Sequence, residues 1–352
     1  MLPVPSSYAS STPRPCTLPV AAGDSLRISV VIPTIRGPDL LCRCLAAVLA
    51  QGLDHRTYEV IVVDAGDAAA SQTVVDSFGN RADAPVVRLV RLRQGHGAAA
   101  ARNAGWRAGY GKVIAFTDDD TVPDADWLAH GERALVPGLI ALCGRVSTAS
   151  CAENTAAARP ANSAPQAPAA DAAVFVTANA FVRRSALLTV GGFDERFQEA
   201  GLEDADLQFR LLRDAGPLGH SNAPVVRRPE RPERWDGCLR EQRNAYFDAL
   251  LYKKHPRLYR ERILRSPPWI HYRIVALTLA APALWAVDIG GSAAVSLLLA
   301  LIGVAHLAIE RLRHTARTPE HVAEMLLTSA LIPFLSVYWR LRGAIHFRVL
   351  FL

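Results

Sequence analysis

The chain has 352 residues, a net charge of +6 and a hydrophobic share of 50%, which is room for two domains or for one domain with an appendage. Its six cysteines include no C-x-x-C pair, which argues against a zinc ribbon or a disulfide scaffold and favours reduced thiols. We expect no secretory signal, and residues 1–26, rich in Pro, Ser and Ala, are predicted to be disordered.

The positive charge is local. Between Arg227 and Arg265, twelve Lys and Arg stand against six Asp and Glu, a surplus equal to the +6 of the whole chain. A basic segment just before an apolar region suits an anionic membrane surface. Nucleic acid is not an expected partner, because no nucleic-acid-binding motif accompanies the charge.

Strands and helices are predicted to alternate in the first half of the chain. Apolar runs predict strands at 28–32, 58–63 and 113–117, and a strand with interleaved arginines is expected at 86–92. Apolar spacing predicts a helix at 39–51, and another is expected at about 97–108. Continuously apolar strands between helices indicate an α/β domain with a mostly parallel sheet covered on both faces. Beyond it, the sequence predicts a helix from Pro123, a mobile low-complexity loop at 150–172, a strand at 173–182, and helices at 203–214 and 235–254.

Three carboxylates, Asp118, Asp119 and Asp120, directly follow the apolar run Val113–Thr117. Ligands of open α/β sheets bind outside the carboxyl ends of the strands. Adjacent carboxylates repel one another unless a cation or hydrogen-bond donors offset them. Oxygen ligands suit Mg²⁺ or Mn²⁺, which proteins often share with substrate phosphates. This stretch alone leaves two interpretations, a metal–diphosphate site and an acidic turn that caps the next helix.

The C-terminal part is predicted to enter a membrane. Ile289–Ile309 is a run of 21 residues without formal charge, long enough to cross a bilayer. A weaker span is expected at about 270–288. Arginines in the link 310–321 and the positive-inside rule place this link and the large N-terminal domain in the cytoplasm. A third apolar helix at about 322–339, with Pro333 inside it, could span or could lie bent, re-entrant or in the membrane plane; a buried helical core is the alternative for the whole region.

Five ordered segments resemble the family 2 glycosyltransferases, which have the GT-A fold. They are Val30–Thr34, Val62–Asp64, Ala101–Gly105, Phe116–Asp120, and Gly191–Glu195 with Glu203–Asp206. The resemblance covers about residues 27–215 and implies a nucleotide-diphospho-sugar transferase fold with a Rossmann-like mixed sheet. The expected organisation is a disordered N-terminus (1–26), a GT-A catalytic domain (27–233), a basic juxtamembrane helical segment (234–268) and membrane helices (269–352).

The resemblance also implies a donor site. Asp118 and Asp120 match the first and third positions of the family's D-x-D motif and would bind Mg²⁺ or Mn²⁺, which stabilises charge on the leaving diphosphate. The remaining donor contacts would be Pro33 and Thr34 flanking the nucleoside, Asp64 on the base, Asp119 on the ribose, and Arg102 supporting the base or a phosphate. Each has a structural alternative, such as a strand-end cap for Asp64 or a solvated helix residue for Arg102.

Asp204 matches the family's general base, which would take a proton from an acceptor hydroxyl. A carboxylate near a helix N-terminus tends to stay ionised. Glu203 would orient the site or the acceptor, although a helix-start capping pair is the structural alternative for both. Arg234 and Trp235 are candidate acceptor contacts.

Two departures from the family pattern stand out. Arg228 occupies the position where many relatives carry a His that completes the metal shell, so that Arg228 could instead neutralise a phosphate. The stretch Arg231–Trp235 keeps the Arg-Trp of the processive synthases' Gln-x-x-Arg-Trp but lacks its Gln, which favours single addition.

The resulting expectation is an inverting, metal-dependent hexosyl- or N-acetylhexosaminyl-transferase of cell-envelope polysaccharide synthesis. It would act on the cytoplasmic face of the inner membrane and use a nucleotide-sugar donor and a lipid-linked, glycan or other membrane-associated acceptor. Polyprenyl phosphate itself is an alternative acceptor. A nucleotidyltransferase is disfavoured because no glycine- and lysine-rich phosphate loop is present. Intact Asp64, Asp118, Asp120 and Asp204 argue against a non-catalytic membrane scaffold.

Overall fold

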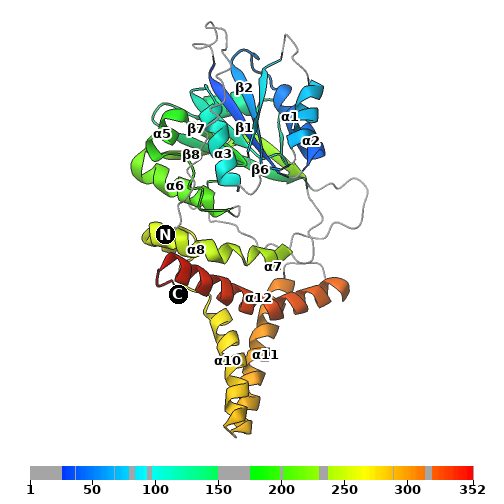
Figure 1. Ribbon diagram of the computed structural model, residues 1–352, viewed down its shortest axis with the longest axis vertical. Coiled ribbons are helices and arrows are strands. Elements are labelled where there is room, and N and C mark those ends of the chain that lie inside the picture. The colour runs from blue at the N-terminus through cyan, green and yellow to red at the C-terminus, as the bar shows by residue number, and fades with distance from the viewer. Residues whose placement is uncertain are drawn as a thin grey trace, which may run out of the picture.

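The structure is a computed structural model, and it combines a sheet covered by helices with a helical C-terminal part that projects away from the sheet (Figure 1). The residues it describes are 26–35, 37–66, 68–78, 84–92, 97–149, 175–198, 201–229, 237–287, 289–313 and 319–351. The predicted disorder of residues 1–26 and the predicted loop at 150–172 therefore lie almost entirely outside the described residues.

Four parallel strands form one half of an eight-stranded sheet, in the order β3-β2-β1-β4. They are β1 (Ile28–Thr34), β2 (Tyr58–Asp64), β3 (Val86–Arg91) and β4 (Val113–Thr117). Every residue of β1, β2 and β4 is buried, as expected for apolar strands that are covered on both faces. These strands match the predicted ones to within two residues at each end.

The other half of the sheet is mixed and continues the order as β7-β6-β8-β5. Its strands are β5 (Val122–Pro123), β6 (Ala141–Ala149), β7 (Asn179–Arg183) and β8 (Leu218–Pro229). β7 is antiparallel to β4 and to β6, whereas β6 and β8 are parallel. The prediction of a strand at 173–182 was wrong at its start, because residues 175–178 are not in strand conformation, with a turn at 177–178, and β7 begins only at Asn179.

Helices cover both faces of the sheet. One face is covered by α1 (Pro38–Leu49), α2 (Ala68–Phe78) and α4 (Trp127–Ala134). The opposite face is covered by α3 (Ala98–Ala108), α5 (Arg184–Val190) and α6 (Leu202–Asp214). Because successive strand side chains point to opposite faces, Val30 and Ile32 pack with α1, while Val31 packs with α3. The result is a three-layer α/β/α body.

Three shorter helices follow the sheet, α7 (Gly237–Glu241), α8 (Asn244–Lys254) and α9 (Pro256–Arg262). The prediction of one helix over 235–254 was wrong, because the chain breaks into a turn at Gln242–Arg243 between α7 and α8. A third hydrophobic cluster joins Phe209 of α6 to Leu250 of α8, Tyr259 of α9 and Phe351. The helix that carries Glu203 and Asp204 therefore packs directly on the C-terminal helices.

The last three helices are α10 (Trp269–Ala286), α11 (Gly290–Leu312) and α12 (Pro319–Phe347). α10 and α11 form a hairpin that projects from the body, and α12 lies crosswise between this hairpin and α8 (Figure 1). By length and composition, α11 and residues 321–347 of α12 could each cross a membrane. The hairpin exposes large apolar side chains such as Leu279, Leu298 and Leu301.

Candidate active site

The predicted donor residues meet at one edge of the parallel sheet. β1 ends at Thr34, β2 ends at Asp64, and the register pairs these two residues side by side. β4 lies on the other side of β1, and its end delivers Asp118, Asp119 and Asp120. Carboxyl ends of parallel strands gather at one edge, which is where ligands of such sheets bind.

Asp119 and Asp64 are buried and hold the loops at this edge. Thr34 Oγ1 donates to Asp119 Oδ2 at 2.9 Å, and the Ile35 amide donates to the same oxygen at 3.4 Å. Asp64 Oδ1 accepts the Gly66 amide at 2.5 Å. Pro33 lies inside β1 beside Val63. In this arrangement both carboxylates fix the loops that follow β1 and β2.

Two arginines bracket the carboxylates Asp118 and Asp120. Arg228, on β8, donates to Asp118 Oδ2 at 2.9 Å and to Asp120 Oδ1 at 3.2 Å. Arg102, on α3, donates to the other oxygen of Asp118 at 3.0 Å and to Glu203 Oε1 at 2.9 Å. Since Arg102 is only 5% exposed, the solvated-helix alternative for it is wrong.

The first turn of α6 carries Glu203 and Asp204 beside Arg102. Glu203 Oε2 accepts the Gly201 amide at 2.6 Å, so this buried carboxylate also closes the helix start. Asp204 Oδ1 lies 3.8 Å from Arg102 Nη1. The same guanidinium thus joins the donor edge of the sheet to the carboxylates of α6.

Asp204 is held by Thr177, which donates its amide at 3.0 Å and its hydroxyl at 2.8 Å. Burial raises the pKa of Asp204 to about 7; the Arg102 charge opposes this rise and the Glu203 charge adds to it. A carboxylate whose pKa lies near neutral pH is suited to act as a general base. Thr177 carries no signal in the sequence, and only the turn before β7 brings it to Asp204.

The residues present fit a divalent cation in part. Mg²⁺ is commonly bound through one or two carboxylates together with substrate phosphates, and Asp118 and Asp120 offer such a pair. Within the described residues no group of three His, Cys, Asp or Glu side chains could hold a metal. The Arg228 guanidinium already contacts both carboxylates, so that a cation fits only if this side chain moves.

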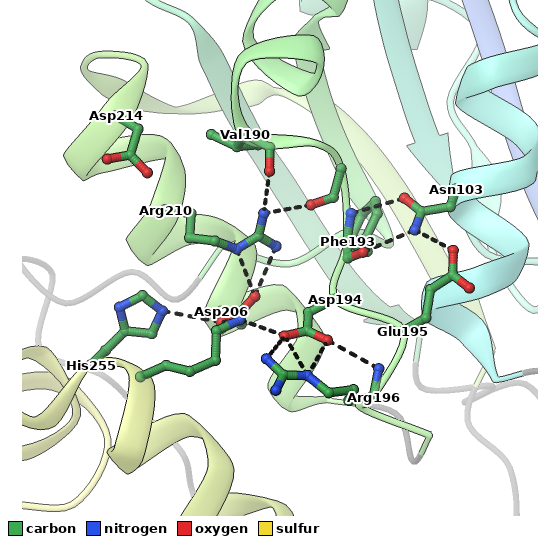
Figure 2. A network of polar contacts seen from close by, with 12 residues as sticks. Asn103, Val190, Phe193, Asp194, Glu195, Arg196, Asp206, Arg210, Asp214 and His255 are labelled. Atoms are coloured by element: carbon green, nitrogen blue, oxygen red, sulfur yellow. Dashed lines mark hydrogen bonds and ion pairs between the residues drawn. The ribbon is translucent and has the colours of Figure 1, made fainter.

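A network of ionic contacts anchors α6 from its other side (Figure 2). Asp206, which is fully buried, pairs with Arg210 at 2.8 Å, with His255 Nε2 at 3.1 Å and with Lys254. Lys254 also binds Asp194, which lies in the Gly191–Glu195 turn, at 2.6 Å. Lys254 and His255 stand at the junction of α8 and α9. This network fixes the helix of Asp204 to the C-terminal helices.

Comparison with known proteins decides the family. The sequence profile of Glycosyl transferase family 2 matches residues 29–188, and that of Glycosyl transferase family group 2 matches residues 113–339, more than half of the chain. The chain belongs to glycosyl transferase family 2. The mannosyltransferase PcManGT from Pyrobaculum calidifontis, solved in complex with GDP-Man and Mn2+, shares its fold with a TM-score of 0.51 at 18% identity, covering 90% of this chain and 84% of that one. The sheet and helices of this family 2 chain thus have the GT-A fold.

Several curated members of the family are similar in sequence. Glycosyltransferase AglE of Haloferax volcanii is 29% identical over 49% of this chain and 58% of its own length. The pre-mycofactocin glycosyltransferase of Mycobacterium tuberculosis is 29% identical over 69% of this chain and 50% of its own length. The dolichyl-phosphate beta-glucosyltransferase of Drosophila melanogaster is 32% identical over 32% of this chain and 37% of its own length. The chain spans about half the length of the first two relatives.

The structure brings together all but two of the residues that the sequence singled out. Pro33, Thr34, Asp64 and Asp118–Asp120 lie at the carboxyl edge of the sheet, and Arg102 links this edge to Glu203 and Asp204. The candidate acceptor contacts Arg234 and Trp235 lie outside the described residues.

Proposed function

We propose that this family 2 chain is an inverting glycosyltransferase that moves a hexosyl or N-acetylhexosaminyl group from a nucleotide-diphosphate-sugar to a lipid-linked or membrane-associated acceptor. One observation carries the proposal. The Arg102 guanidinium bridges Asp118 at the donor edge and Glu203 on α6, with Asp204 3.8 Å away. A carboxylate with raised pKa therefore lies within reach of a sugar that is bound at Asp118 and Asp120.

In the proposed reaction Asp204 takes the proton of the acceptor hydroxyl while the hydroxyl oxygen forms a bond to the anomeric carbon. The bond between that carbon and the diphosphate oxygen breaks, the nucleoside diphosphate leaves, and the anomeric configuration inverts. Thr177 orients Asp204, and Arg102 donates a hydrogen bond to Glu203 beside it. A Mg²⁺ or Mn²⁺ ion at Asp118 and Asp120 would neutralise charge on the leaving diphosphate.

The C-terminal helices support an acceptor that arrives from a membrane. The α10–α11 hairpin exposes apolar side chains along its length, and α12 lies crosswise at its base (Figure 1). This arrangement favours a hairpin that enters the bilayer and an α12 that lies in the interface. We propose residues 27–233 as the catalytic domain, 234–268 as the juxtamembrane segment and 269–352 as the membrane region, with the catalytic domain on the cytoplasmic side as the basic segment favours.

A panel of nucleotide-sugars labelled in the sugar tests this function. Membranes that contain the full chain should transfer label from one donor to a lipid-extractable product, once per acceptor. A ladder of products would contradict single addition, and release of labelled sugar 1-phosphate would indicate nucleotidyl transfer instead. Polyprenyl phosphate is the second candidate acceptor, supported by the similarity to the dolichyl-phosphate enzyme. Its product would be acid-labile and would form without Asp204, since a phosphate is already ionised.

A further inference from the structure

Arg228 holds the two carboxylates that the proposed metal would need. Its Nη2 lies 2.9 Å from Asp118 Oδ2, and its Nε lies 3.2 Å from Asp120 Oδ1. A planar guanidinium that bridges two carboxylates is a strong, directional ion pair. The side chain therefore supplies positive charge to two of the three adjacent carboxylates.

The backbone of Arg228 is fixed, whereas its side chain is accessible. β8 pairs with the short strand β5 directly after the acidic stretch, with Arg227 opposite Val122. The Arg228 side chain is 36% exposed, while that of Arg102 is 6% exposed and also tied to Glu203. Of the two arginines on Asp118, Arg228 is the one whose own charge can turn towards solvent, and a bound cation would then replace it on Asp118 and on the buried Asp120.

A divalent cation and Arg228 cannot share these oxygens. Coordination of Asp118 Oδ2 and Asp120 Oδ1 by a metal requires that Arg228 leave both, which opposes metal binding by the free protein. A diphosphate at the same place offers the displaced, planar guanidinium a bidentate partner. Metal and nucleotide then bind more tightly together than separately, and this coupling is reciprocal.

We propose that Arg228 is an internal counter-ion that keeps divalent metal off Asp118 and Asp120 until a nucleoside diphosphate binds, and that it then turns to the diphosphate. This inference rests on the proposed function, because it presumes a nucleotide-sugar donor at this edge. It assigns to Arg228 a role in binding order that neither a metal-completing His nor a plain surface arginine would have.

The test is direct Mn²⁺ binding to the purified full chain, followed by the electron paramagnetic resonance of free Mn²⁺, with and without UDP or GDP. The wild type should bind Mn²⁺ about tenfold more tightly when the matching nucleotide is present. Arg228→Gln should bind Mn²⁺ without nucleotide about tenfold more tightly than the wild type, and its nucleotide enhancement should shrink. Arg228→Lys, which keeps the charge but loses the fork, should lie between the two.

Arg227→Gln is the matched control, since Arg227 is the next residue on β8 and pairs with Asp124 rather than with the site. It should bind Mn²⁺ as the wild type does. If Arg228→Gln and Arg228→Lys both match the wild type while nucleotide still enhances binding, the counter-ion role is wrong and the donor site stands. If no variant binds Mn²⁺ even with nucleotide, the metal assignment in the proposed function fails, and this inference fails with it.

Discussion

Replacing Lys254 with Met should destabilise the catalytic domain. Lys254 Nζ, whose side chain is 20% exposed, contacts Asp194 at 2.6 Å and also the fully buried Asp206. Hydrogen bonds to charged groups contribute about 1.5–3 kcal/mol each. Asp206 keeps Arg210 and His255, and Asp194 keeps Arg196, so we expect a net loss of about 2 kcal/mol rather than the sum of two such bonds. For a domain of this size, that lowers the Tm by about 4–8 °C.

The assay is thermal unfolding in detergent, followed by tryptophan fluorescence, with Lys253→Met as the matched control. Lys253 is the preceding residue, lies exposed, and donates to the Phe347 carbonyl at 2.7 Å. Its replacement should change the free energy of unfolding by about 0.5 kcal/mol or less. Equal melting temperatures for the two variants would refute the anchoring role of the Lys254 network.

The same network predicts how the stability difference depends on pH. Although burial alone would raise it, hydrogen bonds from Arg196 and Lys254 hold the pKa of Asp194 well below its ordinary 3.8. Burial alone would also raise the pKa of Asp206, but the hydrogen bond from His255 and the charges of Arg210 and Lys254 lower it. Because both values are lower in the folded chain, the stabilisation is complete above about pH 4 and is lost as the pH falls through the folded-state values. The difference between the wild type and Lys254→Met should therefore shrink in acid.

Three further predictions concern the site and the C-terminal helices. Arg102→Met should lower the free energy of unfolding, measured by chemical denaturation, by about 3 kcal/mol, because the buried Glu203 loses its ionic partner. Adding Glu203→Gln should restore part of this loss. A double variant no more stable than the single one would contradict this. Gly343→Ala should weaken the packing of α12 on α8 and lower the Tm, since the added Cβ would clash with the Tyr246 carbonyl oxygen. Gly291→Ala is the control, because a Cβ there meets open space, and its Tm should match that of the wild type. Equal Tm values for the two variants would refute the close approach. Chelation by EDTA should abolish sugar transfer and added Mn²⁺ should restore it; transfer that survives chelation would exclude the metal at Asp118 and Asp120.

Some parts of this structure could be predicted from sequence because their signals are local. Val113–Phe116 is apolar throughout and carboxylates follow at Asp118, so the strand followed from the pattern, and the donor site at its end stays a prediction. β8 could not be predicted in this way, because no residue in its first half is buried and no apolar run marks it. The family resemblance placed Arg228 where many relatives carry a metal-completing His, but its ion pair with Asp118, 110 positions away in the chain, depends on how β8 packs.

The C-terminal helices show the same distinction. The charge-free run at 289–309 predicted α11 closely, since length and hydropathy are local properties. The orientation of the third apolar helix was left open, because it depends on packing: Arg340 of α12 pairs with Asp248 of α8 at 3.0 Å, and Gly343 lies against Tyr246. Long-range contacts of this kind set where an apolar helix lies, and composition does not encode them.

The most direct test of the central claim is the pH–rate profile of sugar transfer to a hydroxyl acceptor by the wild type and by Asp204→Asn. Because the base works only when ionised, the wild-type rate should rise with pH through about 7, the pKa of Asp204, and then level off. Asp204→Asn should be about 10²–10⁴-fold slower, with that rise abolished. A variant that keeps the wild-type rate and profile would show that Asp204 is not the base and would contradict the mechanism proposed for this chain.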